Sequence, residues 1–305
     1  RGIPKLIDAN WAGTAKSNDC TIIFCEGDSA KAGIVSGLSS DDRNVIGVYP
    51  LKGKLLNVRG EISKKITENK EISEIKKILG LESNKKYDKE SIKSLRYGKV
   101  LIMTDQDLDG SHIKGLVLNM FHYFWPSLLD MGFVVSMVTP IIKASKGSKT
   151  LSFFTESRFR EWYQSNPTGW KIKYYKGLGT STSKEFKEYF ANKKIVSFAS
   201  TGDESRNAID KVFNKKRADD RKEWLANYSR DNFLDTNNSK ISYDDFIDRE
   251  MIHFSKYDCD RSIPNVMDGL KISLRKILYS AFKKNLTQEI KVAQFSGYVS
   301  EHSGY

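Results

Sequence analysis

The stretch VLIMTDQDLDGSHIKG, residues 100–115, places three aspartates at alternate positions directly behind an apolar run. Asp105, Asp107 and Asp109 follow the aliphatic residues 100–103, which are typical of a buried strand. Like carboxylates this close repel one another and raise one another's pKa, so the arrangement is costly without a cation. The pattern therefore predicts a divalent metal ion at the point where this strand ends.

The same pattern matches the first half of an EF-hand loop, which needs a bidentate Glu at its twelfth position and a helix in front. Counting from Asp105, the twelfth residue is Leu116, and the preceding segment is a short aliphatic run bounded by Gly98. An EF-hand is therefore excluded. What remains is a strand that ends in carboxylates, then Gly110, then residues 111–125 with apolar residues at helical spacing. In such strand-to-helix units, ligand sites lie at the carboxyl ends of the strands.

A second segment, residues 20–38, has the same order of a buried-type run, a turn that carries Glu26, and apolar residues at helical spacing. Residues 44–49 and residues 132–142 predict two further strands. Alternating strands and helices favour an α/β fold with a mostly parallel sheet flanked by helices. If the first two strands are neighbours in this sheet, Glu26 and the three aspartates converge at one edge.

Oxygen ligands without His or Cys favour Mg²⁺ at such an edge. The chain has 50 Lys and Arg against 38 Asp and Glu, a net charge of +12 that is spread over many segments. This excess favours a polyanionic partner, and nucleic acid is the leading candidate. Magnesium held by carboxylates in a basic protein is typical of phosphodiester chemistry.

The cysteines and the hydropathy pattern exclude other classes of protein. Cys20, Cys25 and Cys259 are odd in number and lack C-x-x-C spacing, which argues against a disulfide framework and against a zinc site. Cys25 follows an apolar run and is predicted to be a small core residue. No apolar stretch of about 18 residues and no signal-peptide pattern occurs, so we predict neither a membrane protein nor a secreted one.

Five motifs together carry a resemblance to a known family. They are, in chain order, EGDSA at 26–30, PLKGKLLNV at 50–58, MTDQDLDGSHIKGL at 103–116, YYKGLGTS at 174–181 and RSIPNVMDGLKISLRKILY at 261–279. The first and third resemble the TOPRIM fold shared by topoisomerases, primases and some nucleases, and the others resemble the type IIA topoisomerases. The glycines of GLGTST are no dinucleotide fingerprint, because Thr182 stands where the third glycine is needed.

The order of these motifs resembles eukaryotic-type topoisomerase II, including its viral relatives, because the last motif follows the TOPRIM segment in one polypeptide. That last motif is similar to the opening of the winged-helix breakage-reunion region. The chain departs from the family at Ile272, Ser273 and Leu274, where Pro-Gly-Gln is usual, and at Lys52, where many members carry Arg. These departures concern positions expected near DNA.

The resemblance implies roles for individual residues. Glu26 and Asp105 would hold the metal ion that contacts the scissile phosphate, Asp105 and Asp107 would hold a second ion, and Asp109 would support them. The implied catalytic residues are therefore Glu26, Asp105 and Asp107. The implied contacts to the DNA backbone are Lys52, Lys54, His112, Lys176, Lys271, Arg275 and Lys276.

The resemblance also implies a domain plan. A TOPRIM domain with its insertions would cover residues 1–200, with a core at about 18–145, and a charged helical tail and linker would cover residues 201–240. Residues 241–305 would begin the winged-helix domain. The family's nucleophilic tyrosine, which forms a phosphotyrosyl bond with DNA, would follow Tyr305, so we expect no nucleophile in this chain and no activity of this piece alone.

As a whole, the resemblance implies an ATP-dependent enzyme that cuts and passes double-stranded DNA as a homodimer. It would use two Mg²⁺ sites per protomer, and an ATPase module outside these residues would use ATP. The expected location is the nucleus, or a viral replication site in the cytoplasm if the source is viral. Two alternatives stay open: another TOPRIM enzyme, such as a primase or nuclease, and a non-catalytic DNA-binding module.

Overall fold

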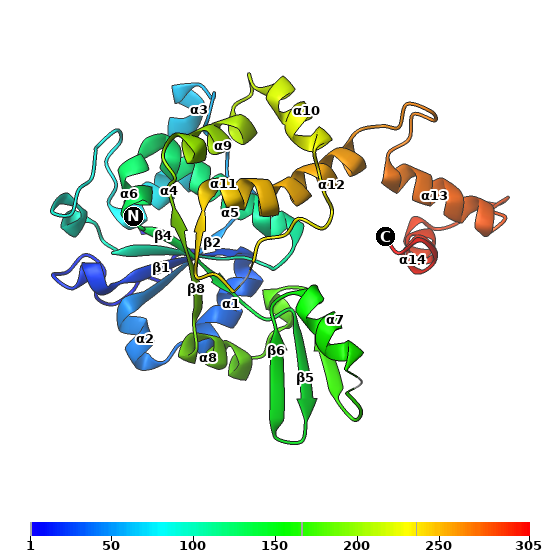
Figure 1. Ribbon diagram of the computed structural model, residues 1–305, viewed down its shortest axis with the longest axis horizontal. Helices are drawn as coiled ribbons and strands as arrows, with labels where there is room; N and C mark the ends of the chain where they lie inside the picture. The colour runs from blue at the N-terminus through cyan, green and yellow to red at the C-terminus, as the bar shows by residue number, and fades with distance from the viewer. Residues whose placement is uncertain (1, 166, 236) are drawn as a thin grey trace. The chain divides into compact units, whose positions relative to one another are not determined.

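The computed structural model describes residues 2–165, 167–235 and 237–305, which form two compact units, Arg1–Met251 and Ile252–Tyr305 (Figure 1). The strands all lie in the first unit: β1 (Thr21–Glu26), β2 (Ile46–Leu51), β3 (Lys99–Met103), β4 (Val134–Val138), β5 (Ile142–Lys146), β6 (Lys149–Phe153), β7 (Lys171–Tyr174), β8 (Lys194–Ala199) and β9 (Lys240–Ser242).

The helices of the first unit are α1 (Gly27–Gly37), α2 (Ser40–Val45), α3 (Ser63–Glu68), α4 (Lys70–Leu79), α5 (Leu108–Phe124), α6 (Pro126–Asp130), α7 (Glu156–Gln164), α8 (Ser183–Ala191), α9 (Asp203–Phe213), α10 (Ala218–Ala226) and α11 (Tyr243–Phe246). Short 3-10 turns are η1 (Ser17–Asp19), η2 (Ser91–Ser94) and η3 (Leu178–Thr180), and η4 (Ile247–Met251) is a π-helical turn. The second unit contains α12 (Ile252–Ser262), α13 (Ile272–Lys283) and α14 (Val292–Ser303).

In the described residues the main sheet has six strands in the order β2-β1-β3-β4-β8-β9. Its neighbours run parallel except for the antiparallel pair β4 and β8. The predicted α/β fold with a mostly parallel, helix-flanked sheet is confirmed. Because β1 pairs with β3 in parallel, with Cys25 opposite Met103, the two strands end at the same edge of the sheet.

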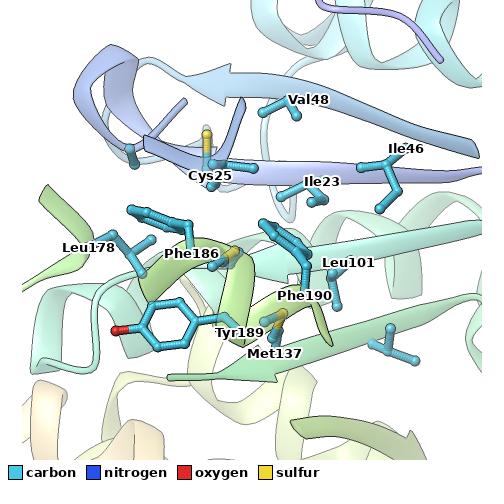
Figure 2. Packing of buried hydrophobic residues seen from close by; sticks show 14 residues of the cluster. Ile23, Cys25, Ile46, Val48, Leu101, Met137, Leu178, Phe186, Tyr189 and Phe190 are labelled. Carbon is cyan, nitrogen blue, oxygen red and sulfur yellow. The ribbon is translucent and has the colours of Figure 1, made fainter. Parts of the chain in front are cut away.

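The core on one face of this sheet follows from the alternation of side chains along each strand. Every second residue of four neighbouring strands points to that face, and α1 and α8 cover it (Figure 2). The cluster contains Ile23, Cys25, Ala30, Ile34, Ile46, Val48, Leu101, Met103, Val135, Met137, Leu178, Phe186, Tyr189 and Phe190. Figure 1 places α5 and α9 on the opposite face. Cys25 is fully buried, as predicted for a core residue.

Two glycines let α1 and α8 pack closely. A side chain at Gly33 or Gly37 would put its Cβ 2.6 Å or 2.5 Å from atoms of Phe186. Helix α8 therefore rests directly on the α1 backbone, and this contact fixes the chain just after the segment KGLGTS. The packing matters for the site because that segment leads from the second sheet back towards α8.

Two predicted strands differ from the observed ones. Residues 44–45 end α2, whose start is fixed by a capping box between Ser39 and Asp42, so β2 begins only at Ile46. The predicted strand at 132–142 is divided, because β4 ends at Val138 and the chain turns at Pro140 before β5 begins in another sheet. The residues between them cannot continue the ladder, since proline has no amide hydrogen to donate.

The second sheet of the described residues has three antiparallel strands in the order β6-β5-β7. Helix α7 packs on one of its faces through aromatic rings, with Phe159 and Trp162 centred 5.4 Å and 5.2 Å from Phe153. This sheet leads through β7 into the segment KGLGTS. It thus delivers that segment to the main sheet.

In the second unit, α13 packs against α14. Arg275 of α13 forms two hydrogen bonds with Asp268, from Nε to Oδ2 at 2.9 Å and from Nη2 to Oδ1 at 2.8 Å. These contacts tie the turn after α12 to the start of α13. None of the described helices is both long enough and apolar enough to cross a bilayer.

A polar network centred on Arg59 joins the segment after PLKGK to α5 and α9. Arg59 donates to Asn119 Oδ1 at 3.0 Å and to Asp210 Oδ1 at 3.1 Å, and its Nη2 lies 2.8 Å from Nδ1 of His122. Asn119 is fully buried and also donates to Asn57 Oδ1. Buried polar groups that are all bonded in this way fix one arrangement of the surrounding chain.

This network predicts a loss of stability in mild acid. Burial and the neighbouring Arg59 charge lower the pKa of His122 to about 4, whereas a histidine in the unfolded chain titrates near 6.5. The unfolded state therefore takes up this proton first, and the free energy of unfolding should fall as the pH drops from about 6.5 towards 4. Urea unfolding at pH 7 and pH 5 measures the change, and His122→Asn, which keeps an acceptor but does not titrate, should reduce it. Equal pH dependence in both chains would contradict the assignment.

Candidate metal centre and nucleic-acid interface

The carboxyl edge of the main sheet brings the four predicted acidic residues together. Glu26 is the last residue of β1, and Asp105 follows the end of the neighbouring strand β3. Asp107 is the N-cap of α5, and its Oδ1 accepts a hydrogen bond from Gly110 N at 2.7 Å. Asp109 lies in the first turn of the same helix. The predicted convergence at one edge thus follows from parallel pairing of adjacent strands.

The electrostatics of this edge are those of a carboxylate cluster. Burial, and then the negative charges of Asp105 and Asp107, raise the pKa of Glu26 to about 7. Burial also raises the pKa of Asp107, with the charges of Asp105 and Asp109 adding to the rise and the Gly110 N–H opposing it. These shifts express the cost of like charges held together, and a bound cation would remove that cost.

A direct test of whether the residues suit a cation is given by Glu26. Its Oε2 atom is buried, and no described residue donates a hydrogen bond to it. A buried carboxylate oxygen without a donor is costly and fits a metal ligand. Among the described residues, no three His, Cys, Asp or Glu side chains form a ready-made ligand set. Mg²⁺ commonly uses one or two carboxylates and completes its shell with water, so these residues fit that ion.

The KGLGTS segment lies directly against the acidic cluster. Leu178 N donates to Asp105 Oδ1 at 2.7 Å, although the two residues are 73 positions apart. Leu178 itself is buried in the core cluster of the sheet (Figure 2). Lys176, two residues earlier, is exposed. The predicted DNA-contacting loop and the predicted metal site therefore belong to one surface.

The PLKGK loop reaches the same edge. Lys54 Nζ lies 2.8 Å from Asp109 Oδ1, and both side chains are 39% exposed. Lys52 is exposed, and its backbone N–H donates to Glu71 Oε1 at 2.6 Å. The two lysines thus stand beside the carboxylates, where the metal ion and a phosphate would share them.

The other predicted contacts are spread over both units. His112 is half-buried in α5, shortly after Asp109. In the second unit, Lys271 is the exposed N-cap of α13, and the Lys276 ammonium lies 5.5 Å from the centre of the Tyr305 ring. Arg275 pairs with Asp268 in this structure, so contact with a phosphate would require it to exchange that partner.

Sequence reasoning did not single out Gly177 and Leu178, whose backbone touches Asp105. The two glycines of the quoted motif marked the segment, but no side-chain pattern reveals a backbone N–H that binds a carboxylate. Arg59 was likewise missed. Its position at the end of the loop residues 50–59 was visible, whereas its partners on α5 and α9 were not.

Three family descriptions match consecutive parts of the chain. The Toprim domain matches residues 21–137, and the C-terminal associated domain of TOPRIM matches residues 137–259. The family of the A-type chains of DNA gyrase and topoisomerase IV matches residues 261–305. The acidic cluster thus lies in the first matched region. The KGLGTS segment lies in the second, and α13 lies in the third.

Curated relatives match over nearly the whole chain. DNA topoisomerase 2 of Plasmodium falciparum is 54% identical over 100% of this chain and 22% of its own length. The probable DNA topoisomerase 2 of Dictyostelium discoideum is 54% identical over 99% of the chain, and DNA topoisomerase 2-beta of Gallus gallus is 52% identical over 100%. The chain spans about a fifth of the length of these relatives, 20% for the last two.

A solved structure matches as closely. The crystal structure of the Plasmodium falciparum topoisomerase II DNA-binding, cleavage and re-ligation domain superposes with a TM-score of 0.90 at 53% identity. The match covers 100% of this chain and 42% of that one. Sequence and fold therefore agree on the same relatives.

Proposed function

This chain belongs to the type II DNA topoisomerase family, and we propose that it supplies the metal site and the DNA-gate contacts of an enzyme that cuts and reseals double-stranded DNA. The family predicted from the five motifs is confirmed by matches over nearly the whole chain. The proposal rests above all on one observation. Glu26 and the three aspartates end adjacent parallel strands, and two lysine-bearing loops lie beside them.

Each acidic residue has a role in this proposal. Glu26 and Asp105 hold the Mg²⁺ ion nearest the scissile phosphate, Asp105 and Asp107 hold a second ion, and Asp109 stabilises the set. When bound, Mg²⁺ supplies stabilisation of negative charge on the attacked and leaving oxygens of the phosphodiester. Asp109 already pairs with Lys54, which keeps the fourth carboxylate from adding its full charge to the cluster.

The basic residues orient the duplex. Lys52, Lys54 and Lys176 contact phosphates beside the metal site, with His112 close to the start of α5. Residues on α13 contact phosphates from the second unit, namely Lys271, Arg275 and Lys276. Contacts to phosphates fix the register of the duplex and carry no direct sequence information, so we expect little sequence preference from them.

The remaining parts of the proposed reaction lie outside these residues. We propose that a tyrosine which follows Tyr305 in the complete enzyme attacks DNA to form the phosphotyrosyl bond, one from each half of a homodimer. An ATPase module drives passage of a second duplex. In this plan residues 1–200 are the TOPRIM domain, residues 201–240 a linker and residues 241–305 the start of the winged-helix domain, and the complete enzyme works in the nucleus.

DNA binding by the 305-residue chain tests the contact model. Because several Lys and Arg side chains would release counterions, the logarithm of the binding constant should fall with the logarithm of the salt concentration by roughly 0.9 per phosphate neutralised. Fluorescence anisotropy with two unrelated duplexes, over a series of salt concentrations, gives the slope. Lys176→Gln should reduce the slope by about one phosphate.

The matched control is Lys99→Gln, because Lys99 is exposed at the amino end of β3, at the opposite end of the strand from Asp105. This control should leave the slope unchanged. Affinity that does not depend on salt, or that is confined to one duplex sequence, would contradict backbone contact. Equal slopes for the two lysine variants would remove Lys176 from the contact set.

A further inference from the structure

The carboxylate of Asp105 lies directly on the backbone of Gly177. A Cβ added at Gly177 would lie 2.6 Å from Asp105 Oδ2, 2.7 Å from Cγ and 2.8 Å from Oδ1. All three distances are shorter than real Cβ atoms tolerate. The next residue, Leu178, donates its N–H to Oδ1 at 2.7 Å. The carboxylate is thus held by one hydrogen bond and by contact with a residue that has no side chain.

Backbone conformation does not explain the glycine at this position. The φ angle of Gly177 is −175°, an extended value that any residue adopts. Space is therefore the reason, and Asp105 is the group that occupies it. Gly179, two residues further on, has no atom within 4 Å of an added Cβ. The two glycines of one motif differ only in what faces them.

The segment on which Asp105 rests is anchored from behind. Leu178 is 2% exposed and packs in the core beneath the sheet edge (Figure 2). The Gly177 carbonyl accepts a hydrogen bond from Thr180 Oγ1 at 2.7 Å, and Ser181 Oγ lies 2.9 Å from the Tyr189 hydroxyl. The segment cannot retreat without breaking these contacts. An added methyl group would therefore displace the Asp105 carboxylate instead.

We propose that Gly177 and the Leu178 N–H are positioning residues that fix the Asp105 carboxylate in its orientation within the acidic cluster. This rests on the proposed function, because the orientation matters if Asp105 binds Mg²⁺. A metal ligand whose second oxygen is bound by the protein is pre-oriented, and loss of such outer partners typically lowers metal affinity or activity by about 10- to 100-fold. The segment after the second sheet would thereby set the geometry of a site on the main sheet.

A double-mutant cycle in metal-free buffer tests the contact by itself. Gly177→Ala should lower the urea midpoint of the 305-residue chain, whereas Gly179→Ala should leave it nearly unchanged. In an Asp105→Ala background, which lacks all three atoms that the methyl group meets, the shift caused by Gly177→Ala should largely disappear. An equal shift in both backgrounds would overturn the contact. If Gly177→Ala alone does not fold, folding of the double variant supports the proposal and its failure to fold contradicts it.

Titration with Mn²⁺, followed by calorimetry, tests the consequence for the metal. We expect Gly177→Ala to bind about 10- to 100-fold more weakly than the unaltered chain and Gly179→Ala to bind equally well. Equal affinity in Gly177→Ala would overturn the positioning role. If the unaltered chain binds no Mn²⁺, the proposed metal site fails, and the metal-free cycle still decides whether Gly177 fixes Asp105.

Discussion

Replacement of Asp107 by Asn in the complete enzyme is expected to lower Mg²⁺-dependent DNA cleavage by roughly 100-fold, a typical loss when one preorganised electrostatic group is removed. The fold should be preserved, because Asn is as good an N-cap as Asp and can still accept the Gly110 N–H. What is lost is one negative charge beside Glu26 and Asp105. Duplex binding should remain within a few-fold, since it depends on the lysines.

Asp41→Asn is the matched control for this experiment. Asp41 is also an exposed aspartate in the first turn of a helix, α2, but that helix precedes β2 and lies at the other end of the strands from the acidic cluster. Cleavage is measured by trapping with denaturant at a series of Mg²⁺ concentrations. Unaltered cleavage by Asp107→Asn, or an equal loss in Asp41→Asn, would exclude the proposed ligand set.

The 305-residue chain alone is expected neither to relax supercoiled DNA nor to become covalently attached to it, even with Mg²⁺ and ATP. Metal ions and carboxylates stabilise developing charge but do not supply a covalent nucleophile. A hydroxyl that forms an ester with DNA must lie within about 3–3.5 Å of phosphorus. The proposal places that tyrosine after Tyr305, in the complete enzyme.

The measurement is denaturant trapping with labelled DNA, with the complete enzyme as the positive control. Tyr305 is 69% exposed and its ring faces Lys276, so it is the tyrosine to examine first if any adduct forms. A covalent adduct that maps to Tyr305 would show that the nucleophile has been misplaced. Extension of the chain through the rest of the winged-helix region should restore cleavage, and ATP-driven strand passage should still need the ATPase module.

The sequence predicted the architecture of the acidic edge because its logic is local. The apolar run before Asp105 and the similar run before Glu26 each form a strand, and parallel pairing of neighbours brings their carboxyl ends together. The alternation of the aspartates also has a local cause. Asp107 caps α5, and Asp109 occupies its first turn.

The contacts that complete the site are not local, and so were not predictable from one sequence. The bond from Leu178 N to Asp105 joins residues 73 positions apart and involves a backbone group that every residue except proline carries. The pairing of Lys54 with Asp109 depends on how residues 50–59 cross the end of α5. A lysine in a loop shows its charge in the sequence but not its partner.

The second sheet was missed for a different reason. Its strands are short, and lysines interrupt the pattern that marks a half-buried strand, as at Lys143 and Lys173, which lie opposite each other. Like charges opposite each other destabilise a sheet. Here Glu188 and Glu185 of α8 accept hydrogen bonds from these two lysines at 3.0 Å and 2.8 Å. The compensating charges come from a helix that follows the sheet in the chain.

The central claim is that the edge formed by Glu26, Asp105 and Asp107 binds a divalent metal ion, and a direct titration of the 305-residue chain with Mn²⁺ tests it. We predict saturable binding by the unaltered chain and by Asp41→Asn, and binding weakened by at least about tenfold in Asp107→Asn, the size of effect expected when the environment of a metal site loses a key group. Absence of binding by the unaltered chain, or equal binding by Asp107→Asn, would contradict the claim.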